Sequence, residues 1–180
     1  MTLLLRFTDG PRYELRRLTL ALAGLCRKAT PENAGVKAEL VQFSKAVNKS
    51  LKALGTKKPE QANLLSGLET AGACLETVFL DMERHALTPD DEAVEALLFT
   101  ERALRSQADF LAHPDRKTSL AEAAGNTAAA SKRLRSALRA SETDGREFIA
   151  NLKFSRIYSG LEKLVCAVYD YNELLAGTFQ

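Results

Sequence analysis

Ser66-Gly67-Leu68-Glu69 occurs a second time as Ser159-Gly160-Leu161-Glu162, and each copy lies inside a long stretch of helix-like apolar periodicity. A second echo precedes each copy, because Ser44-Lys45 and Ser131-Lys132 are followed by apolar residues at the same spacings. The copies are 93 residues apart in one case (66 to 159) and 87 in the other (44 to 131), a difference of less than about two helical turns. The repeated pattern predicts one helical unit in each half of the chain.

The composition is typical of a compact helical protein. The chain has 180 residues, of which 46% are hydrophobic and 27% charged, and it contains no Trp. Its net charge of +2 is too small to indicate a nucleic-acid-binding protein. No apolar run approaches the roughly 20 residues that a membrane-spanning helix needs, and no signal peptide is evident. Cys26, Cys74 and Cys166 lie far apart among apolar neighbours, so we expect reduced, buried thiols in a cytoplasmic protein.

Proline, glycine and capping residues divide the chain into six predicted helices. The expected starts are Pro11, Thr30-Pro31, Lys58-Pro59, Thr88-Pro89, about Ser119, and the capping segment 141–144. The expected ends of the first five are about Lys28, Leu54-Gly55, the segment before Thr88, His113-Pro114 and Arg139.

Three of these helices carry a continuous apolar face. The residues are Leu15, Leu18, Leu22 and Leu25 in the first helix; Leu64, Leu68, Ala71, Leu75, Phe79 and Met82 in the third; and Phe154, Ile157, Leu161, Leu164, Val168 and Leu175 in the sixth. Long helices with short connections pack antiparallel. We therefore predict an all-α fold of two tandem antiparallel three-helix bundles, residues 1–86 and 87–180, packed as one compact unit.

This arrangement resembles the PhoU-like family, including the cytoplasmic domain of bacterial sodium/phosphate cotransporters. In that family the third helix of each repeat carries a motif close to Leu-Glu-Arg-Ile-Gly-Asp. The corresponding segments here are Leu68-Glu69-Thr70-Ala71-Gly72-Ala73 and Leu161-Glu162-Lys163-Leu164-Val165-Cys166. The resemblance implies a regulatory domain in phosphate transport or phosphate sensing, with a membrane transporter or a signalling protein as its partner.

The family's metal site depends on a carboxylate four residues after the glutamate, which places two oxygen ligands on one helical face. Ala73 and Cys166 stand at these positions, so neither repeat keeps the pair. We accordingly expect neither a metal ion nor another cofactor. The remaining Glu69 and Glu162 are interpreted as leftover ligands, structural hydrogen-bond acceptors or solvated residues.

Other candidates for chemistry are few. Asp81 and His85 lie four residues apart, which suits a metal or an acid/base pair, although a histidine in the last turn also favourably meets the helix dipole. His113 beside Pro114 is interpreted in the same way. The chain has no glycine-rich phosphate loop, nucleophile elbow or zinc motif, and we predict that it is not an enzyme.

Two basic rows provide the main indication of a partner. Lys45, Lys49 and Lys52 lie on one face of the second predicted helix, and Lys132, Arg135 and Arg139 lie on one face of the fifth. They are either ordinary solvated faces or a pseudosymmetric surface for anionic lipid headgroups, an acidic partner or phosphate. The alternatives to a PhoU-like regulator at the inner face of the membrane are a metal-binding PhoU-type protein and a helical scaffold unrelated to phosphate. A homodimer is compatible with each of them.

Overall fold

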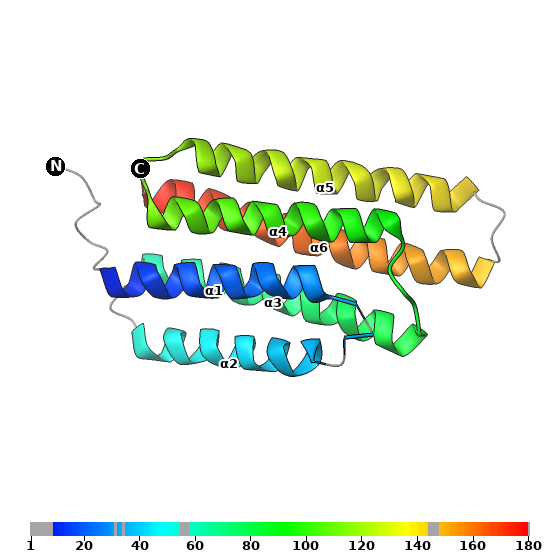
Figure 1. Cartoon of the computed structure of the whole chain (residues 1–180), viewed down its shortest axis with the longest axis horizontal. Coiled ribbons are helices and arrows are strands. Elements are labelled where there is room, and N and C mark those ends of the chain that lie inside the picture. Colours follow the sequence, from blue (N-terminus) through cyan, green and yellow to red (C-terminus); the bar gives the residue numbers. More distant parts are fainter. Residues whose placement is uncertain (1–8, 31, 34, 55–57, 144–147, 180) are drawn as a thin grey trace.

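The chain folds as an all-α protein (Figure 1). The computed structural model describes residues 9–30, 32–33, 35–54, 58–143 and 148–179. Its helices are α1 (Asp9–Lys28), α2 (Val36–Leu54), α3 (Pro59–His85), α4 (Asp91–Ala112), α5 (Thr118–Thr143) and α6 (Phe148–Thr178). The predicted fold class is confirmed. None of the described helices is both long and apolar enough to cross a membrane.

The helices form an elongated assembly with α2 at one edge and α5 at the other (Figure 1). Helices α2, α3, α6 and α5 adjoin in that order, and α1 packs against α4 across the middle. Both α1 and α3 run from left to right in Figure 1, whereas α4 and α6 run in the opposite direction. The pairs α1 with α4 and α3 with α6 are therefore antiparallel, and each pairs one helix from the first half of the chain with one from the second.

The two glycines of the repeated Ser-Gly-Leu-Glu make reciprocal contacts across α3 and α6. A Cβ added to Gly67 would lie 3.3 Å from the side chain of Tyr171, and one added to Gly160 would lie 2.8 Å from that of Val78. Tyr171 follows Val78 by 93 residues (78 to 171), the same separation as the two glycines (67 to 160). Each glycine thus admits the residue at the equivalent position of the other helix, which is the contact pattern of a local pseudo-twofold axis.

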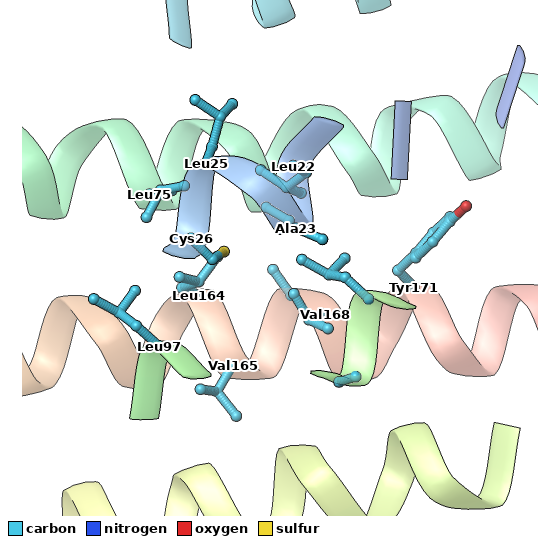
Figure 2. Packing of buried hydrophobic residues seen from close by; sticks show 14 of the residues in the cluster. Leu22, Ala23, Leu25, Cys26, Leu75, Leu97, Leu164, Val165, Val168 and Tyr171 are labelled. Carbon is cyan, nitrogen blue, oxygen red and sulfur yellow. The ribbon is translucent and has the colours of Figure 1, made fainter. Parts of the chain in front are cut away.

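Among the described residues, the buried apolar side chains form a cluster that runs through the middle of the assembly. Figure 2 shows Leu22 and Cys26 of α1 near Leu164 and Val168 of α6, within that cluster. All three predicted apolar faces are buried except at Phe154, which packs partly buried against the cluster. Burial of these faces provides most of the driving force for folding.

Several predicted helix boundaries are wrong. Helix α2 begins at Val36 rather than beside Thr30: Asn33 N–H donates to the Thr30 carbonyl and Val36 N–H to the Asn33 carbonyl, each over 3.0 Å, which are bonds of turns rather than of an α-helix. Helix α1 begins at Asp9, two residues before Pro11, which fits because the first turn needs no N–H donors.

The later boundaries differ for similar local reasons. Asp90, not Thr88, caps α4, because the Asp90 carboxylate accepts a hydrogen bond from Ala93 N–H at 3.1 Å. Helix α5 continues to Thr143, so Ser141 is helical and donates its hydroxyl to the Leu138 carbonyl. The predicted roles of Pro31, Gly55 and Asp144 lie outside the described residues.

Candidate functional site

A groove between α5 and α6 contains the whole basic row of α5. It has a volume of about 620 Å³. Lys132, Arg135 and Arg139 line its α5 side, while Tyr169 and Asp170 line its α6 side. Its lining also includes Ala124, Thr127 and Ala128 of α5 and Val165 of α6, of which Thr127 and Val165 are buried. The groove therefore combines clustered cations with small and apolar lining residues, a combination that suits an anionic ligand with an apolar part.

The basic row of α2 lies in a different setting. Lys45, Lys49 and Lys52 border a depression of about 380 Å³ whose walls come from α2 alone, together with Ser44 and Asn48. All three lysines are exposed. This is a shallow feature of a single helix surface, without a second wall to enclose a ligand.

The two rows do not form one patch. Helices α2 and α5 lie at opposite edges of the assembly, with α3 and α6 between them (Figure 1). Lys45 and Lys132 are nevertheless equivalent in the repeat, being 87 residues apart (45 to 132), as are Lys52 and Arg139 (52 to 139). The structure thus presents two related but separate basic rows.

Beneath the two basic rows, the large and the small residue of an equivalent pair of positions are exchanged between the halves of the chain. In the first half, Phe43 of α2 packs so closely on Gly72 of α3 that a Cβ there would lie 2.5 Å from its ring. The repeat places Ala130 at the position of Phe43 (43 to 130) and Val165 at that of Gly72 (72 to 165). The large residue therefore comes from the outer helix in the first half and from the inner helix in the second.

The four residues at the degenerate metal positions differ in their contacts and exposure. Glu162 accepts a hydrogen bond from Arg135 Nε at 3.1 Å, which joins α6 to α5, whereas Glu69 is half-buried on α3. Ala73 and Cys166, the residues four positions further on, are exposed. Within the described residues, no three His, Cys, Asp or Glu side chains gather as a metal site would require.

Asp81 is part of a structural ion pair. Its carboxylate lies 2.9 Å from Nε of Arg156 on α6 and 3.7 Å from Arg84 one turn away. The Asp81 side chain is largely buried, and His85 occupies the last turn of α3, as expected. Asp81 therefore connects α3 to α6. His113, the other histidine, follows α4 as its C-cap, where its backbone N–H donates to the Asp109 carbonyl at 2.9 Å.

The prediction that all three cysteines are buried is wrong, because their exposure differs. All are free thiols, but only Cys26 is buried; Cys74 is half-buried, and Cys166 is exposed on the wall of the groove. Burial raises the pKa of the Cys26 thiol to about 12, with the nearby Glu101 carboxylate adding to the effect. Cys166 is consequently the accessible thiol of the three.

Tyr169 is the aromatic residue of the groove, and Tyr171 lies two positions further along α6. The structure separates the two: Tyr171 is fully buried and its hydroxyl lies 3.0 Å from that of Thr19, whereas Tyr169 is 44% exposed. A helical wheel of α6 separates them by two positions, or about 200°. This angle is the feature of the sequence that could have predicted their different exposure.

Searches against protein-family models and against curated proteins find no match for this chain.

Proposed function

We propose that this protein is a non-enzymatic PhoU-like regulatory domain that acts in phosphate transport or phosphate sensing at the cytoplasmic face of a sodium/phosphate cotransporter. The observation that carries the proposal is the reciprocal seating of Gly67 against Tyr171 and of Gly160 against Val78. This contact relates the third helices of the two halves as a duplicated three-helix unit would, which is the architecture that the family resemblance implies.

The ion pairs of Asp81 and Glu162, the candidate carboxylates, favour a binding role for the protein over a catalytic one. Asp81 is engaged by Arg156, and Glu162 by Arg135, so both hold helices together. A general acid or base needs a carboxylate that can reach a substrate proton, and both of these already accept a hydrogen bond from an arginine.

The basic row of α2 is the surface proposed to meet the transporter. Lys45 and Lys52 are exposed and make no ion pair within the described part of the chain. Exposed cations on successive turns attract an acidic loop or anionic headgroups when they approach within about 8 Å at physiological salt.

The proposal is tested by deleting the complete gene in the organism that encodes it and measuring phosphate uptake and the activity of a phosphate-starvation reporter. We expect altered uptake or a deregulated reporter, restored by the wild-type gene. The Lys45→Glu/Lys49→Glu/Lys52→Glu variant should fail to restore regulation although it accumulates to the wild-type level, since exposed charges contribute little to folding.

The matched control reverses three exposed cations elsewhere, Lys58, Arg116 and Lys117, and should restore regulation. An unchanged phosphate response in the deletion strain would reject the phosphate role and leave a helical scaffold. Equal failure of both triple variants would reject the α2 row as the docking surface.

A further inference from the structure

We infer that the groove between α5 and α6 binds a nucleoside polyphosphate, with the phosphates along α5 and the base beside Tyr169. The inference is independent of the proposed phosphate role, because it rests on the shape and chemistry of this groove alone. It also distinguishes the two basic rows: only the row of α5 faces a second helix wall.

The cations of α5 match a chain of phosphates. Lys132, Arg135 and Arg139 occupy successive turns of one helix face, and seven residues separate the first from the last, which corresponds to a rise of about 10 Å. A linear polyphosphate can contact several such cations at once, and guanidinium groups bind phosphate oxygens through hydrogen bonds. Arg135 already donates its Nε to Glu162 at 3.1 Å, so a phosphate would meet its terminal N–H groups. The hydroxyls of Ser131 and Ser136 line the same wall and add possible donors.

The opposite wall suits a nucleobase better than more phosphate. Tyr169 exposes 44% of its surface and borders the groove, so its ring is available for stacking on a base. Asp170 beside it repels phosphate but accepts hydrogen bonds from the amino groups that bases carry. The acidic group therefore orients the ligand, with its anionic end on α5 and its base on α6.

The remaining lining residues and the volume of the groove leave room for the ligand. Ala124, Ala128 and Val165 have no polar side-chain atom, and the buried Thr127 hydroxyl donates to the Ala124 carbonyl at 2.9 Å. None of these groups would be left without a hydrogen bond beneath a base or ribose. A volume of about 620 Å³ lies within the range of about 300–1,000 Å³ that is common for small-molecule sites.

Cys166 provides a local reporter for occupancy. It is exposed on the groove wall, while Cys74 is half-buried and does not line the groove. The full chain, in reduced form at low salt, is titrated with ATP, tripolyphosphate and adenosine by calorimetry. The rate of iodoacetamide labelling at each cysteine is followed by peptide mass spectrometry. We expect ATP to bind most tightly and to slow labelling of Cys166 but not of Cys74.

The repeat supplies a matched pair of variants. Lys132→Gln/Arg139→Gln should weaken ATP binding by at least about tenfold, because two phosphate contacts are lost. Lys45→Gln/Lys52→Gln removes the equivalent charges from α2 and should leave binding unchanged. Tyr169→Leu should weaken ATP binding without affecting tripolyphosphate, and all three variants should keep the wild-type circular dichroism and melting temperature.

Four results would overturn the inference. The first two are no protection of Cys166 by ATP and equal weakening by the two double variants. The third is equal affinity for ATP and tripolyphosphate, which would remove the base from the assignment. The fourth is binding to phosphatidylglycerol vesicles that requires Lys132 and Arg139 in the absence of ATP binding, which would assign the groove to lipid headgroups.

Discussion

Glycines in this protein set how closely helices approach, and their positions differ sharply in what a side chain would meet. Gly72 faces the ring of Phe43, Gly160 faces Val78, and Gly125 on α5 has no atom within 4 Å of an added Cβ. The same substitution should therefore have opposite effects at different glycines.

We predict that Gly72→Ala lowers the free energy of unfolding by about 1 kcal/mol. Overpacking of a dense core costs about 1–3 kcal/mol, and the better helix propensity of alanine offsets about 1 kcal/mol of that cost. Gly125→Ala is the control and should stabilise the protein by about 1 kcal/mol, since only the propensity term operates there. Urea unfolding measures both. Stabilisation by Gly72→Ala equal to that by Gly125→Ala would show that Phe43 moves aside without cost.

Helix starts depend on which side chain reaches the unpaired backbone N–H groups of the first turn. The sequence Thr88-Pro89-Asp90-Asp91 contains more than one candidate cap, and the order of residues alone favoured Thr88. Asp90 is the cap because its carboxylate bonds to Ala93 N–H, and Tyr158 of α6 donates its hydroxyl to the other oxygen of the same carboxylate. Asp90 thus both caps α4 and makes a tertiary hydrogen bond to α6.

Asp90→Ala is expected to destabilise the protein by about 1–2 kcal/mol, because α4 loses its cap. Thr88→Ala should change the free energy of unfolding by less than about 0.5 kcal/mol. The Tyr158→Phe variant separates the cap from the interhelix hydrogen bond. Chemical denaturation measures the free energy of unfolding of the three variants. A larger decrease for Thr88→Ala than for Asp90→Ala would show that Thr88 is the cap.

At the scale of the whole molecule, two ionisable groups are enclosed in the core that the two halves share. Cys26 of α1 and Tyr171 of α6 are both buried in that cluster (Figure 2). Burial raises the pKa of the Cys26 thiol from 9.0 to about 12, and it also raises the pKa of the Tyr171 phenol above its ordinary value of 10.0. Neither group can ionise at moderately alkaline pH without disturbing the packing.

We predict that the protein becomes less stable as the pH rises above about 9. In the unfolded chain the Cys26 thiol loses its proton near pH 9, whereas in the folded protein it keeps the proton until about pH 12. Between these two pH values the folded state binds more protons than the unfolded state. The stabilisation that the protonated Cys26 thiol provides is therefore complete below pH 9 and is lost as the pH rises toward 12.

Urea unfolding at several pH values between 8 and about 10.5 tests this. Cys26→Ala should reduce the decline from pH 9 upward, and Tyr171→Phe should reduce it from pH 10 upward. Cys166→Ala is the control, because that thiol is exposed. If the free energy of unfolding fell with the same slope in wild type and in Cys26→Ala, a group other than Cys26 would be responsible for the pH dependence.

The sequence alone determined the helices and their buried faces, because both depend on local periodicity. Residues such as Leu64, Leu68 and Leu75 recur at intervals of three to four positions, and any packing of such a helix buries that face. The repeated Ser-Gly-Leu-Glu also placed the small residue that lets α3 and α6 meet closely. The basic row of α5 was identified from the same periodicity.

Only the tertiary structure decided which of these features face one another. The groove beside Lys132 exists because α6 provides its second wall, and Asp81 meets Arg156 75 residues further along the chain. Cys166 has apolar neighbours in sequence yet is exposed, since it points away from the core beside the buried Val165. Periodicity specifies the face of a helix on which a residue lies, but the identity of its neighbours depends on how distant helices pack, and that depends on the fit of side chains such as Phe43 and Gly72 across the interface.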